Sequence, residues 1–130
     1  MNKLTGKITT LTNKDHLSKV SLAVGNQIFH AIVINVNNIN PNLVIGQKVF
    51  ILFKETEVTL SLKPLEHISI DNKIPVIVDT IKKGVLLSRI VVSLEGIQIN
   101  TVIPAEFALT IQEGMSLIML IRSNELMLME

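Results

Sequence analysis

The sequence LSKVSL at residues 17–22 returns as LSRIVV at residues 87–92, with apolar and polar residues in the same order at most positions. Lys19 corresponds to Arg89, so the two fragments are offset by seventy residues. Alternation of this kind is typical of a β-strand with one buried face. One pair of hexapeptides alone is weak evidence of repetition.

The offset holds on both sides of these fragments. After Gly46 and Gly114 it becomes sixty-eight, so the second copy is two residues shorter just before that point. Corresponding pairs are Asn2 and Asn72, Leu4 and Ile74, Ile32 and Val102, Val33 and Ile103, Lys54 and Arg122, and Glu57 and Glu125. This regularity indicates an internal duplication, with two homologous units of about 60 residues each.

The composition limits the classes of protein that fit. The chain has 130 residues, 48% of them apolar, which is enough for one domain or two very small ones. A net charge of +1 gives no general attraction to nucleic acid or acidic membranes, and the absence of cysteine excludes disulfides and thiolate metal sites. The N-terminal MNKLTGKITT has no apolar signal core, and the run VFILF at 49–53 is too short to span a bilayer. We therefore expect a soluble cytoplasmic protein without a membrane partner.

Segments rich in Val, Ile, Leu and Thr predict strands, because Gly, Asn, Asp and Pro separate them at short intervals. The expected strands are Leu4–Leu11, Leu17–Val24, Ile28–Ile34, Lys48–Lys54, Val58–Leu62, Ile74–Ile81, Leu87–Leu94, Ile97–Ile103, Ser116–Arg122 and Leu126–Met129. Two less regular segments, 35–46 and 105–114, each end in Gly and predict a short helix or helical turn. Pro104 suits the start of the second of these.

Five strands with a helical turn between the third and fourth match a small Greek-key barrel of the OB type. We therefore expect an all-β protein made of two tandem OB-like five-stranded barrel units, each with a short helical turn. The units are expected at residues 1–62 and 73–130, with 63–72 as the linker. Because one such unit is marginal alone, the excess of apolar residues predicts burial between subunits, in a homodimer or homotrimer.

Several fragments resemble one known family. NKLTGKI at 2–8, of the form Asn-x-Leu-x-Gly-x-Ile, resembles the start of the molybdate-binding Mop (TOBE) unit, and VFILFKETEVTLSL at 49–62 resembles its closing strands. DNKIPVIVDTIKKG at 71–84 and TVIPAEFALTIQEG at 101–114 are similar to the second Mop unit of the bacterial molybdate-responsive transcription regulator. The resemblance covers nearly the whole chain and implies a molbindin-like protein with tandem Mop units (di-Mop).

The resemblance implies a site for molybdate or tungstate, which are tetrahedral dianions that only accept hydrogen bonds. Such a site needs N–H, hydroxyl or amide donors and a cation. On the matching positions Lys54 supplies the charge, Asn37 and Asn2 donate hydrogen bonds, and Arg122 repeats the position of Lys54 in the second unit. In the family these sites lie at subunit interfaces, so the oxyanion and further copies of the chain are the expected partners.

Some positions depart from the family pattern. Ile34 and Asn37 stand where the family has Thr and Ser, and Asp71 stands where the first family unit has Arg. A carboxylate at residue 71 would repel an oxyanion. Each candidate also has an ordinary structural interpretation: Lys54 as a solvated strand end, Asn37 as a turn former and Asn2 as a strand cap.

We expect binding of molybdate or tungstate, for storage, homeostasis or sensing, with no catalysis and no cofactor. The alternative is the ligand-sensing half of a molybdate-responsive transcription regulator that lacks its DNA-binding half. An OB-type nucleic-acid module fits less well, because four Phe and a charge of +1 offer few stacking platforms and no basic groove. His16, His30 and His67 are scattered, so no metal site is expected, and the chain has no P-loop, Rossmann or triad motif.

Overall fold

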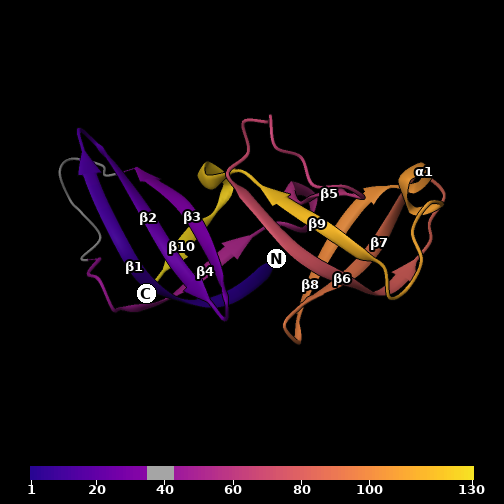
Figure 1. Ribbon diagram of the computed structural model, residues 1–130, viewed down its shortest axis with the longest axis horizontal. Helices are drawn as coiled ribbons and strands as arrows, with labels where there is room; N and C mark the ends of the chain where they lie inside the picture. Colours follow the sequence, from indigo (N-terminus) through magenta and orange to yellow (C-terminus); the bar gives the residue numbers. More distant parts are fainter. Residues whose placement is uncertain (35–42) are drawn as a thin grey trace. The chain divides into compact units, whose positions relative to one another are not determined.

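A computed structural model describes residues 1–34 and 43–130, and these residues are organised almost entirely as β-structure (Figure 1). The ten strands are β1 (Asn2–Lys14), β2 (Leu17–Val24), β3 (Gln27–Ile34), β4 (Lys48–Phe53), β5 (Thr59–Ser61), β6 (Asn72–Lys82), β7 (Leu87–Leu94), β8 (Ile97–Pro104), β9 (Ser116–Ile121) and β10 (Met127–Met129). Two 3-10 turns, η1 (Glu55–Glu57) and η2 (Ser123–Glu125), and one helix, α1 (Ala105–Ala108), complete the elements. Each predicted strand is confirmed within three residues at either end.

The strands form two five-stranded sheets with the same internal order. One sheet runs β10-β4-β1-β2-β3 and the other runs β5-β9-β6-β7-β8. When each strand is numbered within its own repeat, both sheets have the same order, with the first strand at the centre. This is the strand order of an OB-type barrel. In the first of these sheets β10 also contacts β3, the strand at the opposite edge. The predicted all-β fold with two OB-like units is therefore confirmed.

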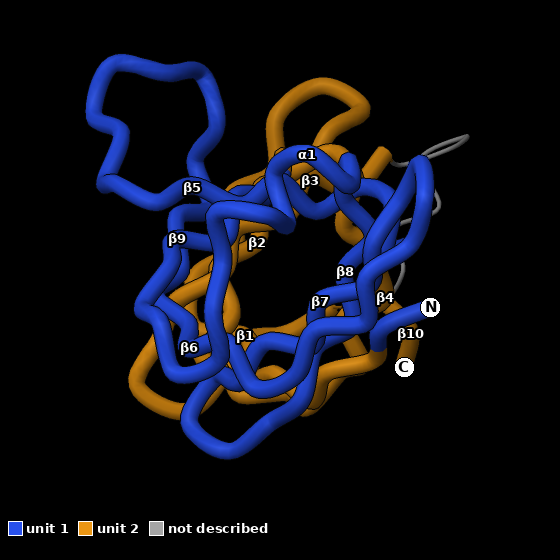
Figure 2. Tube along the Cα trace, turned by 90° about the vertical axis from the view of Figure 1, so that its right-hand side faces the viewer, with its two compact units in different colours: residues 1–2, 54–121 blue, residues 3–53, 122–130 orange. Residues whose placement is uncertain are grey.

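The last strand of each copy pairs with the sheet of the other copy. Leu60 of β5 lies opposite Met119 of β9, and Leu128 of β10 lies opposite Ile51 of β4. The compact units are accordingly residues 1–2 with 54–121 (unit 1) and residues 3–53 with 122–130 (unit 2), coloured separately in Figure 2.

This division differs from the consecutive units 1–62 and 73–130 expected from the sequence. The two copies carry the same strand pattern, so either closing strand fits either sheet, as in domain swapping. Hydrophobic alternation specifies which face of a strand is buried, but it does not specify which of two equivalent sheets the strand joins.

Both long strands bend at equivalent points. The pairing register shifts between Ile8 and Thr10 in β1 and between Val78 and Thr80 in β6. β-Bulges of this kind bend a strand and increase its twist. In unit 1, β6 consequently pairs with β9 before the bulge and with β7 around and beyond it.

Alternating apolar residues of the strands fill one core in each unit. Unit 1 buries Leu60, Ile74, Val76, Val78, Ile90, Val92, Leu94, Ile99, Ile103, Leu117, Met119 and Ile121. Unit 2 buries Leu4, Ile8, Val20, Leu22, Val24, Phe29, Ala31, Val49, Ile51, Phe53 and Leu126. No helix among the described residues is long and apolar enough to cross a lipid bilayer.

The helical segments agree only in part with expectation. A short helix does follow Pro104, but it ends at Ala108 and not near Gly114. The hydroxyl of Thr110 donates to the carbonyl of Phe107, and the Thr110 N–H bonds the same carbonyl, so the chain leaves the α-helical pattern there. Gly114 instead has a φ of +85° in the turn before β9. The other predicted helical segment, 35–46, falls mainly outside the described residues.

Candidate functional site

The two cations predicted to bind an anion occupy the same structural position in separate units. Lys54 directly precedes η1 in unit 1, and Arg122 directly precedes η2 in unit 2. Both have extended backbone, with φ of −79° for Lys54 and −69° for Arg122, and both side chains are exposed. The duplication is therefore preserved at the level of these turns, and the surroundings of each cation decide what it can bind.

Two carboxylates, Glu55 and Glu57, follow Lys54 in the η1 turn. Its ammonium lies 4.0 Å from a carboxylate oxygen of Glu57, and its side chain is 60% exposed. Glu55 accepts a hydrogen bond of 2.9 Å from the N-terminal ammonium of Met1, and this bond lowers the pKa of Glu55 below its ordinary value. Glu55 is thus ionised at neutral pH. Glu57 offsets the charge of Lys54 and the Met1 ammonium pairs with Glu55, so the turn has no unopposed cation and attracts an anion weakly.

The turn after Arg122 has a different character. Ser123 and Asn124 stand where η1 has Glu55 and Thr56, so Glu125 is the one carboxylate in η2. Arg122 forms no ion pair with any residue that the structure describes. A guanidinium, a hydroxyl and an amide thus lie in consecutive residues, and all three can donate to an oxyanion. Ser123 and Asn124 are not among the residues predicted from the sequence, although the aligned turns ETE and SNE differ at these two positions.

The side chain of Asn2 is hydrogen-bonded to the backbone of Asn100 and does not lie on an open surface. Its Nδ2 donates to the carbonyl of Asn100, and its Oδ1 accepts from the Asn100 N–H, both at 2.8 Å. Its side chain is only 4% exposed. These two bonds tie the start of β1 to β8 within unit 1, and one N–H of the amide remains for another acceptor.

The remaining predicted residues are distributed as follows. Asn37 lies outside the described residues. Asn2 and Lys54 belong to unit 1, whereas Arg122 belongs to unit 2, where η2 contacts β3. Of the three predicted residues that the structure describes, two therefore lie in unit 1 and one in unit 2.

A cavity of about 340 Å³ in unit 1 lies between the η1–β5 segment and the end of β8 with α1. Its walls are largely apolar, with Val58, Leu60, Ile103 and Phe107 among them, and Thr56 and Thr59 add two hydroxyls. No cation lines it. An anion has no charge partner there, so we do not place the oxyanion in this cavity.

Residues 1–34 and 43–130 contain no group of three His, Asp or Glu side chains placed to hold a metal ion.

The chain was compared with known proteins. A scan against models of protein families finds no match, and a search of curated proteins finds no significant match. A search of solved structures finds the cytoplasmic molybdate-binding protein ModG, in a crystal form with molybdate bound, at a TM-score of 0.91. The match covers 98% of this chain and 94% of that chain, with 21% sequence identity. At this identity the similarity establishes a shared fold over the whole length.

The bonds of Asn2 lead to a prediction about stability. Asn2→Ala leaves the N–H and C=O of Asn100 without these partners at a largely buried position. We expect the free energy of unfolding to fall by roughly 1–3 kcal/mol, measured by urea denaturation. Thr5→Ala, on the exposed face of the same strand, is the control. A loss no larger than that of Thr5→Ala would contradict the assignment of Asn2 as a structural tie.

Proposed function

We propose that this protein binds molybdate or tungstate as an intact tetrahedral dianion in the cytoplasm and catalyses no reaction. The observation that carries the proposal is the similarity in fold to ModG, a molybdate-binding protein, over nearly the full length of both chains. The equivalent cations Lys54 and Arg122 support it, because each duplicated unit retains a positive charge at the same turn.

We propose the η2 turn as the stronger of the two anion-binding positions. Arg122 supplies a fixed positive charge, and its planar guanidinium can donate two parallel hydrogen bonds to one oxyanion. Ser123 and Asn124 add a hydroxyl and an amide. The η1 turn is weaker, because Lys54 is already paired with Glu57, whose charge opposes a dianion.

We further propose that copies of the chain associate and that the anion is held where they meet. Several large apolar side chains in each unit stand in solvent in a single chain: Ile34 is 69% exposed at the end of β3, and Leu109 is also exposed. β3, whose last residue is Ile34, is also the strand that η2 contacts. Apolar surface beside the η2 turn would let a second copy cover the anion, which strengthens its electrostatic interactions.

Calorimetry on a matched pair of variants tests the binding proposal. Because Arg122→Gln and Lys54→Gln remove equivalent cations, they isolate the effect of the surrounding turn. We expect molybdate and tungstate to bind to the unmodified protein, and Arg122→Gln to weaken binding roughly tenfold to a hundredfold, the range for a hydrogen bond to a charged group. Lys54→Gln should weaken it less. Sulfate and phosphate serve as competing anions.

Two results would contradict this account. Absence of heat with both molybdate and tungstate, at micromolar protein and millimolar anion, would refute the binding function. A larger loss for Lys54→Gln than for Arg122→Gln would refute the assignment of the stronger position.

Light scattering coupled to gel filtration tests the association. One chain has a mass of 14.4 kDa, and we expect two or three times that mass, because the exposed apolar surface is removed from water on association. Ile34→Asp should shift the mass toward the single chain, whereas Thr5→Asp, at an exposed polar position, should leave it unchanged. A single-chain mass with and without molybdate would rule out a site between copies.

A further inference from the structure

The loop between β6 and β7 in unit 1 borders a second cavity, which is open to solvent and has a volume of about 270 Å³. Lys82, Lys83 and Arg89 line it, together with Gly84, Ser88 and two apolar side chains, and every ionisable residue in the lining is a cation. Lys82 lies directly opposite Arg89 in the β6–β7 ladder. Like charges facing each other across a strand pair are destabilising, so three cations here favour an anion between them.

One carboxylate outside the cavity, that of Glu55, interacts electrostatically with Arg89. Arg89 is among the causes that lower the pKa of Glu55, although the bond from Met1 is the main one. Glu55 does not line the cavity, and its charge is largely engaged by Met1. The cluster of Lys82, Lys83 and Arg89 therefore keeps a net positive charge.

Ser88 is the buried polar side chain of the cavity. It is 2% exposed, and its Oγ accepts a hydrogen bond of 3.2 Å from the Gly84 N–H. Within the described part of the chain its hydroxyl proton is donated to no acceptor. The proton of this hydroxyl is therefore available to an acceptor in the cavity. An anion in the cavity would supply the acceptor.

The first copy shows the same serine with its acceptor in place. Ser18, which corresponds to Ser88, donates its hydroxyl to Oδ1 of Asn13. The residue that corresponds to Asn13 in the second copy is Lys83, whose ammonium cannot accept a hydrogen bond. The second copy has thus replaced an internal acceptor by a cation.

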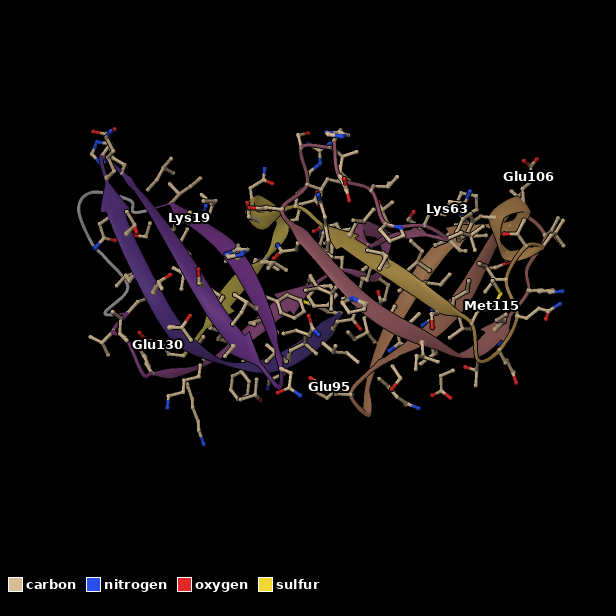
Figure 3. All side chains as sticks on the ribbon, in the orientation of Figure 1. Lys19, Lys63, Glu95, Glu106, Met115 and Glu130 are labelled. Carbon is tan, nitrogen blue, oxygen red and sulfur yellow. The ribbon has the colours of Figure 1, made fainter. Side chains whose placement is uncertain are left out.

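Two more positions distinguish the loops. Lys82 stands where the first copy has Thr12, and Arg89 stands where it has Lys19, which Figure 3 labels on β2. Because Gly84 replaces Lys14, the two cations at these positions in the first copy, Lys14 and Lys19, become three in the second, and the Ser88 hydroxyl is left available to an external acceptor.

Gly84 allows the loop to close on Ser88. A Cβ at this position would lie 2.1 Å from the backbone oxygen of Leu87, so any other residue would force the backbone apart. The close approach brings the Gly84 N–H to the serine hydroxyl. This bond occupies an acceptor position of Ser88 and leaves its proton to be donated elsewhere.

We propose that the β6–β7 cavity binds the phosphate group of a small soluble molecule, either inorganic phosphate or a small phosphate monoester. Ser88 donates its hydroxyl proton to a phosphate oxygen, and Lys82, Lys83 and Arg89 balance the charge. A phosphate monoester carries about −1.5 to −2 at neutral pH and offers three acceptor oxygens, which suits several convergent donors. The volume is just below the ~300–1,000 Å³ of typical small-molecule pockets, so a small anion fits best. This site is separate from the molybdate site and does not depend on it.

Amide resonances of the full-length protein, followed while inorganic phosphate or glycerol phosphate is added at constant ionic strength, test the proposal. We expect saturable shifts at Gly84, Ser88 and Arg89. Lys83→Asn restores the residue of the first copy, so Ser88 regains an internal acceptor as a cation is lost. That variant should bind phosphate roughly tenfold to a hundredfold more weakly. Lys14→Asn removes one cation from the loop of the first copy and is the matched control.

Shifts that do not saturate at these residues, or affinity unchanged in Lys83→Asn, would overturn the proposal. An equal loss in Lys14→Asn would also overturn it, because binding would then follow net charge alone. Ser88→Ala gives a second test if Lys83→Asn does not fold, and it should likewise weaken binding. Molybdate calorimetry on Lys83→Asn separates the two sites: unchanged molybdate affinity with lost phosphate affinity is the expected result.

Discussion

The structure depends on the exchange of the two closing strands. β5 and β10 each contain only three residues, yet each adds backbone hydrogen bonds to an edge that would otherwise expose unpaired N–H and C=O groups. Because each closing strand comes from the other copy, neither sheet is complete within its own half of the sequence. The duplication thus produces one interdependent chain and not two independent small domains.

The exchange also decides the surroundings of the candidate binding residues. Lys54 and Arg122 lie where the chain passes from one unit to the other, so each is placed among elements of the opposite copy. Lys54 precedes a turn that contacts β8, and Arg122 precedes a turn that contacts β3. Duplication preserved the barrel in both places, while surface substitutions made the turns chemically different. The β1–β2 and β6–β7 loops diverged in the same way, around Ser18 and Ser88.

Much of the fold could be predicted because period-two alternation is a local signal. It gave the ten strands and the repeat, but not the partner of β5 or β10, since two homologous sheets offer the same pattern of buried positions. The end of α1 was missed because the side chain of Thr110 competes for the Phe107 carbonyl. At the candidate site, Lys54 and Arg122 could both be predicted from the sequence. The structure was needed to find the bonds between Asn2 and Asn100, because these residues are ninety-eight positions apart. It was also needed to find that the Ser88 hydroxyl accepts a hydrogen bond but donates none to the described residues.

Hydrogen exchange on a chain shortened to end at Leu126 tests the strand exchange most directly. This truncation removes β10 and keeps the buried Leu126 side chain. The account predicts faster exchange for the amides of β4 that face β10, with β9 still protected between β5 and β6. Loss of protection in β9, with β4 unchanged, would show that the closing strand pairs within its own copy and would contradict the account.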